Sequence, residues 1–253
     1  MPDITKEEFK EKSGYEIDGI WYPRVTKIVE IKAKPALYRF YAKMENFESA
    51  ERMKEISAQE GTLVHDTIEK ILTGKPYDID DRITPSVGAF FRFLEEHEIS
   101  VKPEHVEVRL VNKDERYAGT LDAIAKIGGK IGVLDIKTSQ EIYRDYNLQT
   151  SAYVAAMKPV VPEIETRWIL RIDQAQKCLR CGALLRKKGG RIAVKTEFGN
   201  KAMWRCRHEW GPVEGIVELG EFPEWEDDYK AFLGAKKLWE WENRATLLEI
   251  GYL

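Results

Sequence analysis

Apolar residues along the chain follow two periods, a helical one and a strand-like one. They recur every three or four positions from about Gln59 to Leu72, which predicts a helix. A second helix, rich in aromatic residues, is expected from about Pro85 to His97. Strict alternation follows and predicts a three-strand meander. The expected strands cover residues 105–111, 119–127, 131–138, 166–173 and 214–219. Further helices are expected at about residues 144–157 and 223–248, and the first sixty residues read as helical after a strand-like stretch at residues 19–29.

This order of helices, meander, helix and strand predicts an α/β core with a mixed β-sheet flanked by helices. A chain of 253 residues suits one sizeable domain, here residues 1–253, with an insertion at residues 174–212. The apolar runs are too short to cross a membrane, and the N-terminal segment lacks the apolar core of a secretory signal. We therefore expect an intracellular (cytoplasmic) protein that makes no membrane contact.

The basic residues are concentrated in the expected insertion. Residues 174–212 hold ten Lys or Arg and two Glu, a local balance of +8 in a chain whose net charge is −3. A basic segment on an acidic body suits binding of a polyanion such as nucleic acid. A solvated surface segment explains the charge equally well, so both interpretations stay open.

The register of one hairpin follows from its turn. Gly128-Gly129 separates two apolar strands, and a two-residue glycine loop suits a tight hairpin. With these two residues as the loop, Asp122 and Asp135 face each other across the strands, roughly 4.5–5.5 Å apart at Cβ. Lys137 lies on the same face because side chains alternate with a period of two.

Two facing carboxylates repel each other unless a cation compensates them. Oxygen ligands with open positions suit Mg²⁺ or Mn²⁺, and a neighbouring lysine can orient a water and stabilise charge on a phosphate. A surface Asp–Lys ion pair would be the structural alternative. The apolar residues around Asp122 and Asp135 oppose it, because a strand that is apolar on both faces is buried.

Four motifs in this order resemble the PD-(D/E)XK nuclease superfamily, in particular its RecB-type exonuclease branch, which includes CRISPR-associated and viral RecB-like nucleases. They span about residues 61–153. The motifs are Gly61-Thr-Leu-Val-His65, Gly119-Thr-Leu-Asp122, Asp135-Ile-Lys137-Thr-Ser139 and Gln149-Thr-Ser-Ala-Tyr153. Each motif is weak alone, whereas the ordered set is specific. The resemblance implies a restriction-endonuclease-like core.

The resemblance also implies a role for each residue. His65, Asp122, Asp135 and the backbone carbonyl of Ile136 would bind the catalytic Mg²⁺ or Mn²⁺. Lys137 would position the attacking water. Gln149 and Tyr153, four residues apart on one helix, would share a face toward the DNA, unless they simply form the amphipathic border of that helix. Glu107 is a further acidic candidate near the metal.

The implied reaction is metal-dependent hydrolysis of a phosphodiester bond in DNA, most readily by an exonuclease acting on single strands or duplex ends. The chain has no Walker A loop, so a helicase or recombination partner would have to supply a motor. The alternatives are a non-catalytic nucleic-acid-binding module and an assembly subunit of a repair, recombination or viral replication complex.

Three cysteines and a histidine predict a second metal site. Cys178-Leu-Arg-Cys181-Gly182 has the form of a zinc knuckle, and Cys206-Arg-His208 would complete a tetrahedral set for structural Zn²⁺. Glu209 stays open as the fourth ligand because the Cys-x-His spacing is short. Some RecB-type nucleases hold a four-cysteine iron–sulfur cluster, but three cysteines favour zinc. This zinc-binding insertion would grip the DNA backbone, stabilise the fold or dock a partner.

Overall fold

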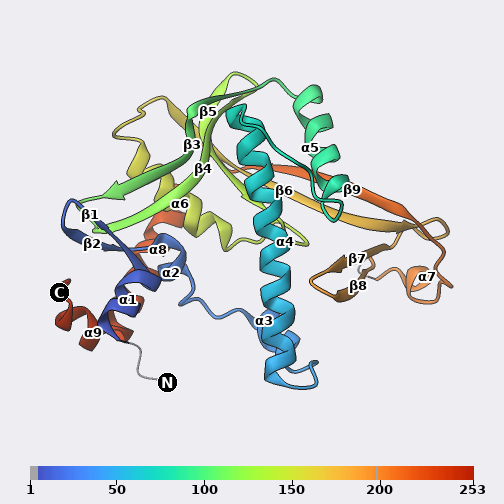
Figure 1. The fold of residues 1–253 in the computed structure, drawn as a ribbon, viewed down its shortest axis with the longest axis horizontal. Coiled ribbons are helices and arrows are strands. Elements are labelled where there is room, and N and C mark those ends of the chain that lie inside the picture. Colours follow the sequence, from blue (N-terminus) through green and yellow to red (C-terminus); the bar gives the residue numbers. More distant parts are fainter. Residues whose placement is uncertain (1–4, 198) are drawn as a thin grey trace.

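The computed structural model describes residues 5–197 and 199–253 and shows a mixed α/β fold in which helices flank a mostly antiparallel sheet (Figure 1). The strands are β1 (Gly14–Ile17), β2 (Ile20–Pro23), β3 (Ile99–Asn112), β4 (Tyr117–Ile127), β5 (Lys130–Lys137), β6 (Ile164–Cys178), β7 (Leu184–Lys188), β8 (Arg191–Lys195) and β9 (Trp210–Glu221). Strands β3 to β8 follow one another in the main sheet, and β9 pairs with β6. β5 and β6 pair in parallel, whereas the other neighbouring strands of this sheet are antiparallel.

The helices occupy both faces of the sheet. They are α1 (Lys6–Ser13), α2 (Val25–Val29), α3 (Pro35–Tyr41), α4 (Phe47–Thr73), α5 (Thr84–Glu96), α6 (Tyr146–Met157), α7 (Lys201–Trp204), α8 (Glu226–Glu242) and α9 (Arg244–Glu249). One core joins the sheet to α2, α6 and α8, and the other joins it to α4 and α5. Among the described residues, no helix combines the length and apolar character needed to cross a membrane.

The β4–β5 hairpin has the register that its turn predicts. Gly128 and Gly129 have φ angles of 54° and 87°, values at which a side chain would strain the backbone. The ladder then runs from Ile127 opposite Lys130 to Ala123 opposite Leu134. The prediction from the two glycines is therefore confirmed as far as this last pair.

Several predicted boundaries were wrong. The helix expected from about Gln59 starts at Phe47, where the side chain of Asn46 caps it by accepting the N–H of Ser49. Residues 25–29, expected to be strand-like, form α2. The C-terminal helix is interrupted at Asn243, whose backbone N–H and side-chain amide both donate to the carbonyl of Trp239.

Candidate active site at the end of the β4–β5 hairpin

Asp122 and Asp135 lie one step beyond the last ladder pair of the hairpin, where the two strands begin to separate. The side chain of Asp122 accepts the backbone N–H of Ile136 at 2.5 Å. This side-chain bond occupies the position at which a further backbone pair would form. The β4–β5 ladder ends at Ala123, and Thr120 of β4 pairs on the other side of its strand, with Arg109 of β3. The carboxylates are thus neighbours at the opening of the hairpin, although the ladder does not continue through them.

Asp135 is held in place from two sides. Its side chain is 1% exposed, and Gln149 of α6 donates to Oδ1 at 3.1 Å. The ammonium of Lys137 lies 2.6 Å from Oδ2. Oδ2 is buried and makes no well-formed hydrogen bond among the described residues, so the Lys137 ammonium is its ion-pair partner. A buried carboxylate needs such a cation, whether an ammonium or a metal ion.

Burial makes the charged forms of both carboxylates costly. Burial raises the pKa of Asp135 to about 6, with Lys137 opposing the shift and Asp122 adding to it. Burial likewise raises the pKa of Asp122, against the effect of Lys137 and of the Ile136 N–H. Desolvation, more than repulsion between the two carboxylates, keeps both pKa values raised, and a bound divalent cation would favour their ionised forms.

His65 reaches the same cluster from α4. Its Nδ1 atom lies 3.9 Å from Oδ2 of Asp122. Desolvation and the nearby Lys137 lower the pKa of His65 to about 4, so the imidazole is neutral at neutral pH. A neutral imidazole is the form that binds a metal.

Glu107 is placed beside Asp122 by a β-bulge in β3. The register of β3 against β4 shifts between Val101 and Val106, and Glu107 adopts a φ of 53°. Its neighbours Val106 and Val108 pair with the residues on either side of Asp122. Desolvation and the charges of Asp122 and of two α4 carboxylates raise the pKa of Glu107 to about 7. Glu107 therefore lies beside Asp122, and its role near a metal stays a prediction.

Gln149 and Tyr153 share a face of α6, as predicted, but the orientation expected for Tyr153 was wrong. Gln149 donates to the hydroxyl of Tyr153 at 2.9 Å as well as to Asp135. Tyr153 is 1% exposed, and a Cβ added to Gly119 would lie 2.7 Å from its ring. The absence of a side chain at Gly119 lets the ring pack against β4, so Tyr153 supports the cluster from within the core and does not face DNA.

The donors suit a divalent cation in kind, although they do not form a closed set. Two carboxylates and a neutral imidazole are ligands that Mg²⁺ or Mn²⁺ can take, and Oδ2 of Asp135 has free lone pairs. Ile136, whose carbonyl was assigned to the metal, is bonded to Asp122 through its N–H. Among the described residues, the one group of three or more potential ligands whose atoms all lie within 4.8 Å of one another is the Cys/His group described below. Closing the carboxylate set would require Lys137 to move away from Asp135.

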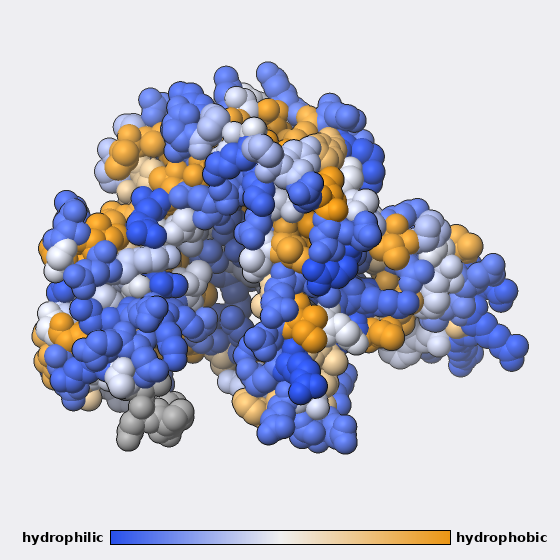
Figure 2. Space-filling model, viewed as in Figure 1, coloured by the Kyte–Doolittle hydropathy of each residue, from blue (hydrophilic) through white to orange (hydrophobic). Residues whose placement is uncertain are grey.

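A hydrophilic recess opens beside α4 on the face shown in Figure 2, between that helix and the lobe formed by α1, β1 and β2. Near this lobe, the Tyr15 hydroxyl lies 3.4 Å from the Thr120 hydroxyl, and the guanidinium groups of Arg24 and Arg109 lie 4.4 and 4.8 Å from the centre of the Tyr15 ring. Sequence reasoning missed these residues, because only the fold brings them near Asp122.

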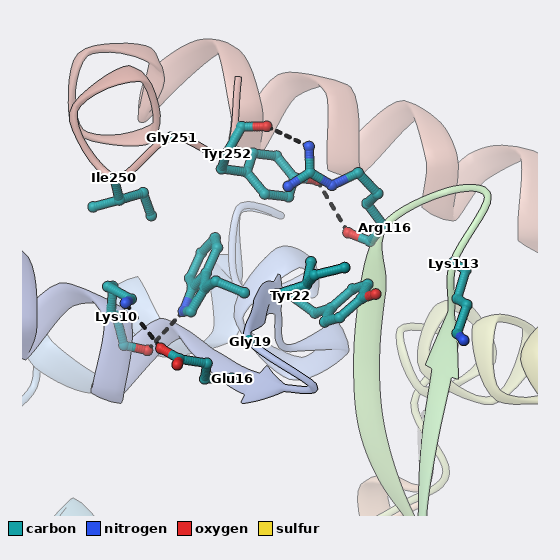
Figure 3. A pocket seen from close by; sticks show the side chains of 11 residues that line it. Lys10, Glu16, Gly19, Tyr22, Lys113, Arg116, Ile250, Gly251 and Tyr252 are labelled. Carbon is teal, nitrogen blue, oxygen red and sulfur yellow. Dashed lines mark hydrogen bonds and ion pairs between the residues drawn. The ribbon is translucent and has the colours of Figure 1, made fainter.

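A separate pocket lies between β2 and the C-terminal turn (Figure 3). The guanidinium of Arg116 stacks on the ring of Tyr252 and donates to its carbonyl at 2.6 Å. Trp21 donates to the carbonyl of Lys10 at 3.0 Å. These contacts close the C-terminus against β4, and none of the predicted site residues lines the pocket.

Cys178, Cys181, Cys206 and His208 form a group that can hold a metal ion such as zinc. Sγ of Cys181 lies 3.4 Å from Nδ1 of His208, and the sulfurs of Cys178 and Cys206 are 4.0 Å apart. The four ligand atoms lie within 4.8 Å of one another. We call this group and the turns that carry it the metal clip.

Local hydrogen bonds shape the metal clip, and an ion pair distinguishes between its two candidate fourth ligands, His208 and Glu209. The N–H of Gly182 donates to the carbonyl of Cys178, which closes the knuckle turn, and Gly182 has a φ of 78°. Burial opposes ionisation of Cys178, but backbone N–H groups and His208 outweigh it and lower its pKa to about 5. The carboxylate of Glu209 pairs with Arg180 at 3.0 Å and is absent from the four-residue group. The geometry thus favours His208.

Comparisons with known proteins do not identify a family for this chain. No protein-family model matches the chain, and no curated protein matches it significantly.

Cation affinity is expected to rise with pH because the cluster must be ionised to bind metal. The pKa values of Asp135 and Glu107 are raised to about 6 and about 7. If both must ionise, affinity for Mg²⁺ should rise about 100-fold between about pH 5.5 and about pH 8. Isothermal titration calorimetry measures this, and equal affinity at the two pH values would contradict it.

The same raised pKa values make the cation-free protein less stable as the pH rises. Folding raises the pKa of both carboxylates, so their protonation stabilises the fold. That contribution is complete below the unfolded pKa of about 4 and is lost as the pH rises through about 6 to 7. Without divalent cation, the stability that these two carboxylates contribute should therefore decline as the pH rises, which thermal melting at several pH values measures. Asp135→Asn should weaken this pH dependence of the melting temperature.

Proposed function

We propose that this chain is a metal-dependent DNA nuclease of the PD-(D/E)XK superfamily, RecB-type branch, with a restriction-endonuclease-like core. The observation that carries the proposal is the buried carboxylate of Asp135, which accepts a hydrogen bond from Gln149 and is ion-paired with Lys137. Asp122 and His65 lie at the same point. The ordered motifs in the sequence support the same assignment.

Each residue then has a defined task. His65, Asp122, Asp135 and the carbonyl of Ile136 would hold Mg²⁺ or Mn²⁺, which when bound would supply Lewis-acid stabilisation for phosphodiester hydrolysis. Lys137, released from Asp135, would orient the attacking water by hydrogen bonding. Gln149 keeps the carboxylate of Asp135 in position through the bond at 3.1 Å.

The substrate proposed is DNA, as single strands or duplex ends, cleaved by exonuclease action. The net positive charge of the insertion and the hydrophilic recess beside α4 both suit a polyanion. We further propose that the metal clip holds structural Zn²⁺. A helicase or recombination protein would be the partner that presents the strand.

A cleavage assay tests the proposal directly. The full chain is incubated with end-labelled single-stranded DNA, the matching duplex and an RNA of the same sequence, each with Mn²⁺, Mg²⁺ or no divalent cation. Cleavage of DNA only with a divalent cation is the expected result. No cleavage of any substrate under these conditions, with DNA binding retained, would replace this proposal by a non-catalytic binding or assembly role.

A further inference from the structure

The hairpin β7–β8 returns from the metal clip to the carboxylate cluster. The ammonium of Lys188, the last residue of β7, donates to the backbone carbonyl of Thr138 at 2.6 Å. Arg186 donates to the same carbonyl at 3.1 Å. Thr138 directly follows Lys137, so both basic side chains reach the end of β5 where the cluster lies.

The tip of this hairpin is fixed on α4. The N–H of Gly189 donates to both carboxylate oxygens of Glu60 at 3.2 Å. A Cβ added to Gly189, whose φ is 58°, would lie 2.0 Å from the Ser57 hydroxyl. The contact therefore depends on a glycine, and it places the hairpin within two turns of His65 on the same helix.

A second glycine provides room for the lysine. A Cβ added to Gly61 would lie 2.9 Å from the hydroxyl of Thr138 and 3.8 Å from Nζ of Lys188. Gly61 is the first residue of the motif that ends at His65. It thus permits α4, the end of β5 and the tip of β7 to meet at one point.

Lys188 differs from Arg186 and Arg171, the other basic side chains that reach the end of β5, in lacking a carboxylate partner. Arg186 pairs with Asp173 at 2.6 Å, and Arg171 also pairs with Asp173. Lys188 is half-buried, and in the part of the chain that the structure describes no carboxylate lies within 4.0 Å of its ammonium. Its charge nevertheless reaches the cluster, because it helps to lower the pKa of His65. A half-buried cation without a carboxylate partner is suited to an anionic ligand.

We propose that Lys188 binds a backbone phosphate of the DNA at the nuclease site, and that the metal clip, at the base of its hairpin, positions it. This inference rests on the proposed nuclease function. The knuckle is the turn between β6 and β7, and Cys178 also pairs with Trp210 of β9. Five residues of β7 then extend from the clip to the cluster, roughly 3.3 Å per residue.

The test measures DNA binding instead of cleavage. Binding of a labelled oligothymidylate is followed by fluorescence anisotropy in Ca²⁺, without chelator so that the clip stays loaded, over a range of salt concentrations. Lys188→Gln keeps a donor for Thr138 but removes the charge. The matched control is Lys187→Ala, on the exposed opposite face of the same strand.

Lys188→Gln should bind about 10-fold more weakly than the parent, the cost of losing one charged hydrogen bond. The slope of log affinity against log salt should fall in magnitude by about 0.7, the value of one phosphate contact on a single strand. Lys188→Arg should restore most of both, and Lys187→Ala should match the parent. If Lys188→Gln does not fold, Lys188→Ala is measured in its place.

Parental affinity and parental salt slope in a folded Lys188 variant would overturn this inference while leaving the nuclease proposal intact. A parent protein that cleaves no DNA would instead overturn the proposed function. Zinc content and melting temperature are recorded for every variant. A Lys188 variant that loses affinity only together with its metal would show a structural role and would also overturn the inference.

Discussion

Asp135→Asn is expected to reduce DNA cleavage by on the order of 10³-fold or more, a loss of about 4 kcal/mol of transition-state stabilisation. The substitution keeps the shape of the side chain and an oxygen for the Gln149 donor, but it removes the charge that a cation would need at the buried Oδ2. Single-turnover cleavage of labelled DNA in Mn²⁺ measures the effect.

Lys137→Gln is the second variant because it removes the ammonium that lies 2.6 Å from Asp135 without adding volume. It should lose cleavage to a similar extent while still binding DNA. Asp114→Asn, an exposed position in the turn between β3 and β4, is the control and should cleave like the parent. Cleavage that survives in both Asp135→Asn and Lys137→Gln would mean that the catalytic site lies elsewhere.

The hairpin register could be predicted because its determinants are local. Gly128 and Gly129 set the turn, and alternation then places every later side chain on one face or the other. The approach of Asp122 to Asp135 and the side of Lys137 follow from that turn alone. The ending of the ladder at Ala123 does not, because it depends on the side chain of Asp122 taking the N–H of Ile136.

The bulge in β3 shows why other parts of the site needed the fold. The alternation of residues 105–111 predicts a strand, but it does not indicate that β3 begins at Ile99 or that its register shifts before Val106. That shift brings Glu107 beside Asp122. The burial of Tyr153 is similar, since it depends on the fit of its ring against Gly119, which is distant in sequence.

The insertion was the least predictable part of the candidate site. Its basic residues were expected to grip the DNA backbone, to stabilise the fold or to dock a partner, and these roles stay predictions. In the structure β7 joins the main sheet through β6, and Gly189 docks the hairpin on α4. Composition identified the positive charge, whereas only the packing at Gly61 and Gly189 places Lys188 against Thr138 at the end of β5.

Cys181→Ser is expected to abolish metal binding at the clip and to loosen the hairpin that carries Lys188. Structural zinc contributes roughly 10–16 kcal/mol of apparent binding free energy in zinc-finger peptides. Here the β6–β9 pairing remains, so a smaller loss is expected, at least about 3 kcal/mol and a melting temperature lower by about 6–12 °C. Metal analysis of the purified variant and thermal melting measure the two effects.

Hydrogen exchange locates the damage, because the clip holds the turn between β6 and β7 while β4 and β5 are paired independently of it. Amides of residues 182–209 should exchange faster in Cys181→Ser, with those of the β4–β5 hairpin unchanged. Glu209→Gln is the matched control and should retain the metal, since its carboxylate pairs with Arg180. Full metal content in Cys181→Ser, or its loss in Glu209→Gln, would show that Cys178, Cys181, Cys206 and His208 are not the ligand set.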